Sequence, residues 1–154
     1  MNAAIGAVIA VVVAGIGDYV RYRFARKRGS EDRRVASYIA ALDALNAYSH
    51  ALTEAVIMWS ERKEVVIDAD AIKERILATD RQLQVQQSAI RINCPHAYEE
   101  FRSAYTAVDK LRSLVDEPSQ ELKNNGVRSA DWVQKHGEFD NAREAFVTKA
   151  MQNP

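Results

Sequence analysis

The chain has 154 residues, of which 47% are hydrophobic and 27% are charged, and its formal net charge is zero. This length favours one folded domain with an additional tail or anchor, and the low Gly and Pro content excludes collagen-like and low-complexity chains. The single cysteine, Cys94, excludes an intramolecular disulfide framework and a Cys-rich zinc module. The sequence contains no catalytic signature, so we expect neither an enzyme nor a cofactor.

The first twenty residues have the properties of a transmembrane helix. No residue from Met1 to Gly17 is charged, and the run continued through Val20 gives about 20 residues, or roughly 30 Å of helix, which matches a bilayer core. Asp18 interrupts the run only near its end. A cleaved signal peptide would carry its positive charge before the apolar run, and a buried core helix is usually amphipathic. The sequence therefore favours a membrane anchor at residues 1–20 rather than a signal peptide or a buried core helix.

Basic residues follow the predicted anchor at once, and the whole chain is uneven in charge. Residues 1–34 carry seven Lys and Arg against three Asp and Glu, whereas residues 35–154 carry fourteen against eighteen. By the positive-inside rule, the basic cluster keeps the following chain in the cytoplasm; the cluster consists of Arg21, Arg23, Arg26, Lys27 and Arg28. We therefore predict a single-pass protein of the cell membrane with a cytoplasmic body.

Residues 21–34 form a basic juxtamembrane elbow in this interpretation. Basic clusters beside a membrane attract anionic lipid by about 1 kcal/mol per residue. The acidic body has no second basic patch and no helix suited to reading a groove, so we do not expect nucleic-acid binding.

The predicted anchor also carries a stripe of small residues, Gly6, Ala10 and Ala14, at every fourth position. Small residues at this spacing let two helices approach closely, which would allow a homo-oligomer. The alternative is that an anchor rich in Ala and Gly contains the spacing by chance.

Residues 35–154 have the periodicity of amphipathic helices. In the first predicted helix, capped by Ser30, apolar residues recur in steps of three and four, as in a coiled coil, and only Ser49 interrupts them. The stripe is Val35, Tyr38, Leu42, Leu45, Ser49, Leu52, Val56 and Trp59. The second predicted helix, about residues 70–93, is unusually polar and has a shorter apolar stripe, Ile72, Ile76, Leu83 and Ile90. We expect it to be the least buried of the helices.

Two more helices follow. Pro95 starts the third, whose apolar stripe is Tyr98, Phe101, Tyr105, Val108, Leu111 and Val115. A long connection ends at the turn signal Asn124-Asn125-Gly126. Ser129 caps the last helix, whose predicted buried face is Trp132, Val133, His136, Phe139, Phe146 and Val147. Four such helices predict an all-α fold, in which an N-terminal transmembrane helix precedes an antiparallel four-helix bundle over residues 35–154.

The chain resembles a group of small membrane proteins of high-GC Gram-positive bacteria and their phages. The resemblance is carried by the predicted anchor and basic elbow, followed by "VASYIAALDALNAY", "IRINCPHAYEEFRSAYTAVDKL" and "REAFVTKAM". It implies a single N-terminal span and a cytoplasmic helical bundle. It carries over no functional residue, because that group has no established activity.

Two sets of residues could carry chemistry, and both are better explained structurally. Cys94, His96, Glu99 and Glu100 are the densest set of metal-ligand types, but they lack the paired spacing of a zinc or di-iron site and suit a helix N-terminus. Ser49 and His50 point about 100° apart around a helix and have no visible oxyanion hole. We predict no metal site and no catalytic residue.

Two functions remain open at this point. The first is a membrane-tethered interaction or scaffold module that binds an unknown protein partner, with Ile57, Met58 and Trp59 as a candidate apolar patch. The second is a small membrane effector of phage or defence type that acts through its anchor.

Overall fold

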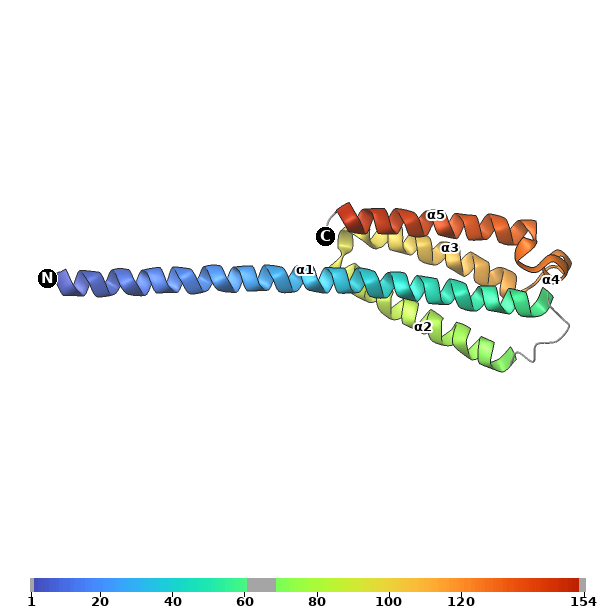
Figure 1. The fold of residues 1–154 in the computed structure, drawn as a ribbon, viewed down its shortest axis with the longest axis horizontal. Helices are drawn as coiled ribbons and strands as arrows, with labels where there is room; N and C mark the ends of the chain where they lie inside the picture. Colours follow the sequence, from blue (N-terminus) through green and yellow to red (C-terminus); the bar gives the residue numbers. More distant parts are fainter. Residues whose placement is uncertain (1, 61–68, 153–154) are drawn as a thin grey trace.

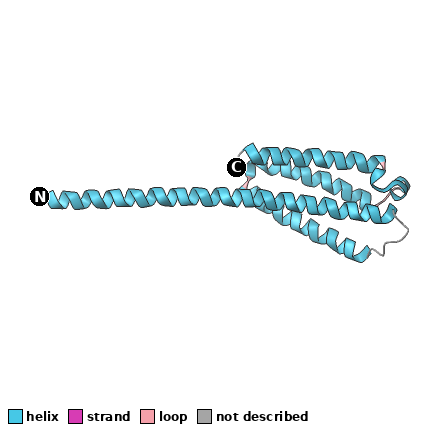
Figure 2. Cartoon of the chain, viewed as in Figure 1, coloured by secondary structure: helices cyan, strands magenta, loops and turns pink. Residues whose placement is uncertain are grey.

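The chain is described here from a computed structural model, in which residues 2–60 and 69–152 are placed, with side chains for 29–60 and 70–152. This part of the chain is all-α, as predicted (Figure 2). The α-helices are α1 (Asn2–Ser60), α2 (Ala69–Asn93), α3 (Tyr98–Asp116), α4 (Gln120–Asn125) and α5 (Ala130–Gln152). Short 3-10 turns, Pro95–Ala97 and Gly126–Arg128, precede α3 and α5.

The C-terminal half of α1 forms a bundle with α2, α3 and α5 (Figure 1). Successive long helices run in opposite directions, and the N-terminal half of α1 projects from one end of the bundle as a straight helix. The most extensive contacts join α1 with α2 and α3 with α5. The C-terminus lies at the end of the bundle from which α1 projects, so the projecting helix and the last turns of α5 are neighbours.

The predicted helix start at Ser30 is wrong, because α1 continues unbroken through this position. A glycine at position 29 costs only about 1 kcal/mol relative to alanine inside a helix, and no proline lies nearby to stop the helix. The flanking residues are ordinary helix formers. The local capping signal is therefore overridden by continuation of the helix on both sides.

Alanines form much of the buried face of α1, which the apolar stripe did not include. Tyr38, Leu45, Ser49, Leu52 and Val56 of that stripe are buried, as expected. The buried face also contains Ala41, Ala44, Ala51 and Ala55. Because α1 contacts α2, α3 and α5, more than one side of it is covered, and small side chains allow the helices to approach closely.

The other predicted stripes are largely confirmed. The four apolar residues of the α2 stripe are buried, as are Phe101, Val108, Leu111 and Val115 in α3 and Trp132, Phe139 and Phe146 in α5. Two expectations are wrong: Val35 and Val133 are exposed, the latter by 58%. Val35 lies where α1 leaves the bundle, and Val133 lies one position beyond Trp132, on a side of α5 that no helix covers.

The connection between α3 and α5 is a compact cap on the far end of the bundle. Ser119 accepts a hydrogen bond from the backbone N–H of Leu122 and so starts the short helix α4. Gly126 has a φ of 56°, and a Cβ there would lie 2.7 Å from the Cβ of Ser60 at the end of α1. The predicted turn at Asn124-Asn125-Gly126 thus needs glycine for both backbone conformation and space. Ser129 accepts a hydrogen bond from Trp132 N–H (3.3 Å), which confirms it as a helix cap.

Candidate interaction surfaces

The predicted anchor lies outside the residues whose side chains are placed. Its small-residue stripe (Gly6, Ala10 and Ala14) and the basic cluster (Arg21, Arg23, Arg26, Lys27 and Arg28) belong to this segment. Within the part of the chain whose side chains are placed, no helix is long and apolar enough to cross a membrane. The membrane location therefore stays a prediction from the sequence.

The candidate patch Ile57, Met58 and Trp59 is only half exposed. These residues lie in the last turn of α1, and Met58 and Trp59 pack against the hydrophobic core. Part of their apolar surface is therefore already used inside the bundle. Their proposed role in partner binding stays a prediction.

The residues near the start of α3 that could in principle bind a metal each contact a different partner within the protein. The buried thiol of Cys94 faces the backbone oxygen of Arg34 at 3.7 Å, and burial raises the pKa of this thiol. Glu99 lies 3.8 Å from Arg102, and Glu100 lies 3.9 Å from Lys149. Within the placed part of the chain, no three His, Cys, Asp or Glu residues are arranged to hold a metal ion.

Hydrogen bonds of Asn93, Cys94 and His96 hold the turn between α2 and α3 against α1. The hydroxyl of Tyr38 and Nε2 of His96 are 2.6 Å apart, and Asn93 Nδ2 donates to Ser37 Oγ at 2.9 Å. Tyr38 and Ser37 belong to α1, close to the point where it leaves the bundle. The turn therefore helps to fix the direction in which the N-terminal helix projects.

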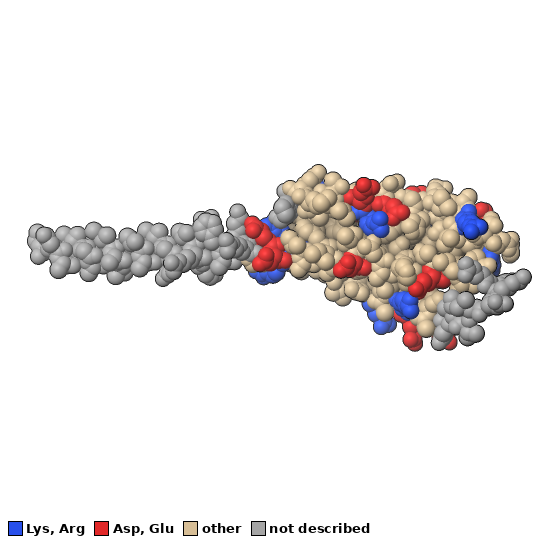
Figure 3. Space-filling view, viewed as in Figure 1, with Lys and Arg blue, Asp and Glu red and all other residues tan. Residues whose placement is uncertain are grey.

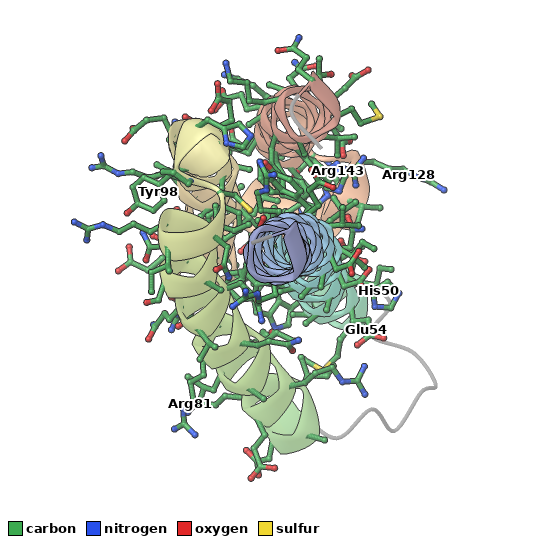
Figure 4. All side chains as sticks on the ribbon, turned by 90° about the vertical axis from the view of Figure 1, so that its left-hand side faces the viewer. His50, Glu54, Arg81, Tyr98, Arg128 and Arg143 are labelled. Atoms are coloured by element: carbon green, nitrogen blue, oxygen red, sulfur yellow. The ribbon has the colours of Figure 1, made fainter. Side chains whose placement is uncertain are left out.

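The other two histidines, His50 and His136, form contacts at the surface and between helices. Ser49 is buried whereas His50 is exposed, so the two adjacent side chains do not meet. His50 lies 3.4 Å from Glu54, which also pairs with Arg75 of α2. Figure 4 shows His50 and Glu54 next to each other at one edge of the bundle, on the opposite side of the view from Arg81.

His136 belongs to a second set of contacts, on α5. It lies 3.0 Å from Asp140, which pairs with Arg143, and Arg143 donates to Asn46 of α1 at 3.1 Å. These contacts help to hold α5 against α1. They resemble a structural network rather than a reaction centre.

A charged cluster that the sequence analysis did not identify joins three helices. Arg112 of α3 donates to Asp80 of α2 at 3.0 Å and to the hydroxyl of Tyr48 of α1 at 3.3 Å. The hydroxyl of Tyr105 donates to Asp80 at 3.0 Å. Burial raises the pKa of Tyr48, and its hydrogen bond to Arg112 is the main cause of a raised pKa for Arg112. The cluster therefore contains a permanent cation paired with a carboxylate.

The outer side of α2 carries an apolar stripe. Val85 is 64% exposed, Ile92 is 78% exposed and Leu77 is also exposed. Arg81 lies four residues from both Leu77 and Val85, so the three share one side of the helix, and Figure 4 shows Arg81 projecting away from the bundle. The opposite side of α2 forms the core, so this helix carries apolar residues on two sides, and the outer side also exposes Glu74, Arg81 and Ser88. The spacings of eight and seven residues were a sequence signal for this stripe.

A second apolar surface is a groove between α1 and α5, at the end of the bundle from which α1 projects. It has a volume of about 240 Å³, and its lining consists mainly of Val35, Ile39 and Leu42 from α1 and Val147, Ala150 and Met151 from α5. Ile39 is 57% exposed and Met151 69%. Among the residues with described side chains, none of those lining the groove is charged. On the face of the bundle shown in Figure 3, charged side chains occur in small groups separated by uncharged surface.

Comparison with protein families, with characterised proteins and with solved structures finds no match to this chain. Its functional assignment therefore depends on the two apolar surfaces and on the N-terminal segment.

Proposed function

We propose that this protein is a membrane-tethered interaction module without catalytic activity. In this proposal the N-terminal segment spans the bilayer, the basic cluster keeps the bundle in the cytoplasm, and the outer side of α2 binds a protein partner. The uncharged run before Asp18 and the five basic residues after it support the tether. The continuation of α1 into the bundle supports a direct mechanical link between the tether and the binding domain.

The observation that carries the partner-binding part is the second apolar face of α2. A helix on the outside of a bundle normally presents polar residues to solvent, yet α2 exposes Leu77, Val85 and Ile92 over 15 positions, or about 22 Å of helix. Anchors spaced by about two turns each suit an amphipathic partner helix that lies along α2. The exposed residues Glu74 and Arg81 lie on this same side, about two turns apart, and favour a partner with a basic and an acidic residue at matching positions.

The tether predicts that the full-length protein behaves as an integral membrane protein. We expect it to stay in the membrane pellet during alkaline carbonate extraction, because hydrophobic insertion does not depend on ionic contacts. A label at the C-terminus should react only after the cells are made permeable. Release by carbonate would contradict the membrane span, and labelling of intact cells would contradict the cytoplasmic orientation.

The partner surface predicts a selective effect of Val85→Asp. A charge at the centre of the apolar stripe should lower capture of the partner from solubilised membranes by at least about tenfold, since burying an unpaired charge costs more than 1.4 kcal/mol. Val133→Asp is the matched control, because Val133 is similarly exposed but lies on α5. Comparative mass spectrometry of the captured proteins would test this. Equal loss in both variants, or no loss in either, would contradict binding through α2.

The alternative function, a small membrane effector acting through its anchor, differs in one measurable property. If the protein is an interaction module, a shortened chain that starts at residue 29 should still bind the partner that the full chain binds. An effector shortened in this way should lose its effect on the membrane, measured as loss of membrane potential in expressing cells. Depolarisation by the full chain, unaffected by Val85→Asp, would support the effector instead.

A further inference from the structure

We propose that the groove between α1 and α5 is a pairing surface for a second copy of this chain in the same membrane. The inference rests on the proposed tether, which would place the two copies side by side with their α1 helices parallel. In a two-fold pair, Ile39 of each copy would enter the groove of the other, so that one patch serves both partners.

The shape and chemistry of the groove suit an aliphatic side chain. Its volume of about 240 Å³ exceeds the roughly 150 Å³ of an engineered cavity that accepts benzene. The rings of Tyr38 and Phe146, whose centroids are 6.0 Å apart, also line it, and both residues are buried. Ile39 and Met151 lie at the edge of the groove, and their side chains are largely exposed. The surface thus combines a recess with a protruding aliphatic residue, which is what self-complementary pairing requires.

The position of the groove on α1 favours a second copy as the occupant. Gly6 and Val35 are 29 positions apart, as are Ala10 and Ile39. This separation is about eight turns at 3.6 residues per turn, and α1 is one helix over Asn2–Ser60. By helical periodicity, Gly6 and Ala10 of the predicted anchor therefore fall on the same side of α1 as the groove residues Val35 and Ile39. Two parallel copies that approach along this side would make both contacts.

The size of the surface indicates that pairing depends on the membrane. Stable protein–protein interfaces bury about 800 Å² per partner, and the groove has only three strongly exposed apolar residues, Val35, Ile39 and Met151. Two tethered copies have a much higher effective concentration than free copies. We therefore expect pairing in vesicles and monomers at the same protein content in solution.

The test uses the full chain reconstituted into phosphatidylcholine vesicles. Ile39→Cys, Val85→Cys and Val133→Cys are compared for disulfide-linked dimers after oxidation with copper-phenanthroline. All three positions are exposed, and buried Cys94 is common to all. We expect Ile39→Cys to yield at least about five times more dimer than either control. In wild-type vesicles, energy transfer between copies labelled at the C-terminus should be lost with Ile39→Asp and kept with Val85→Asp.

Vesicle flotation of every variant separates the two proposals. Suppose that the protein floats with the vesicles, but the three cysteine variants give equal dimer yields or Ile39→Asp keeps full energy transfer. Either result would overturn pairing through the groove and leave the proposed tether intact. Protein that does not float would overturn the tether and, with it, the membrane-dependent pairing. The circular dichroism spectrum of Ile39→Asp should match that of wild type because the side chain is mostly in solvent. If the spectra differ, the comparison of the three cysteine variants alone decides whether the copies pair through the groove.

Discussion

Replacing Phe101 by Ala is expected to lower the free energy of unfolding by about 3–5 kcal/mol, a large part of the stability of a small domain. The Phe101 side chain is fully buried. Its ring packs edge-on against Phe146 with centroids 5.5 Å apart, and so joins α3 to α5. Truncation removes this contact and leaves a cavity that the surrounding helices can fill only partly. Urea unfolding of the full chain in detergent, followed by circular dichroism, would measure the change.

Glu100→Ala provides the neighbouring control. Glu100 is half exposed and lies 3.9 Å from Lys149, so its loss should change stability by no more than roughly 0.5 kcal/mol. If the segment from Cys94 to Glu100 held a metal, Glu100→Ala would lower the melting temperature only when metal is present. Melting curves with and without a chelator distinguish these cases, and a chelator-sensitive wild type would contradict the structural interpretation.

Replacing Arg112 by Met is expected to lower the free energy of unfolding by about 2–4 kcal/mol, because it leaves a carboxylate without its cation inside the protein. Asp80 has 14% of its side-chain surface exposed and Arg112 has 26%, so some solvent screening remains and the effect falls below that of a fully buried pair. The hydroxyl of Tyr48 loses a hydrogen-bond donor in the same variant. The measurement is again urea unfolding.

Two further variants would identify the cause of this loss. Arg102→Met removes an arginine of α3 that is 62% exposed, and should change stability by less than about 0.5 kcal/mol. Arg112→Met combined with Asp80→Asn removes the unpaired charge, and should recover part of the loss. An equally unstable double variant would show that packing of the arginine stem, rather than charge, accounts for the effect.

The same cluster gives a pH dependence. Burial raises the pKa of Tyr48 and of Tyr105, so both hydroxyls keep their protons more firmly in the folded chain than in the unfolded chain. The stability that they contribute is complete below the ordinary tyrosine pKa and is lost as the pH rises above it. Alkaline unfolding of wild type should therefore start above about pH 10.

The existence and order of the long helices could be predicted from the sequence. Apolar residues at steps of three and four mark the buried sides of α2, α3 and α5, and Ser129 and Gly126 mark a cap and a turn through local chemistry alone. These features depend on nearest neighbours along the helix. They are therefore present in the sequence whatever the helices later contact.

Tertiary packing decided which surfaces were covered. The sequence shows that residues 35, 85 and 133 are valines, but only the positions of the neighbouring helices show that Val35, Val85 and Val133 are exposed. In the same way, the alanines of α1 are buried because α2, α3, α4 and α5 all pack against this helix. Side-chain type alone does not reveal this, since alanine is common both inside and outside helical bundles.

For this protein, the sequence by itself determined the all-α class, the four long helices and the uncharged N-terminal segment, because helical periodicity and charge depend on residues close along the chain. Only the tertiary structure brought Tyr48, Asp80 and Arg112 together from three helices and formed the groove between α1 and α5. Contacts between residues 32 or more positions apart depend on how the helices are rotated and spaced. That arrangement results from packing of the whole core, which no local pattern specifies.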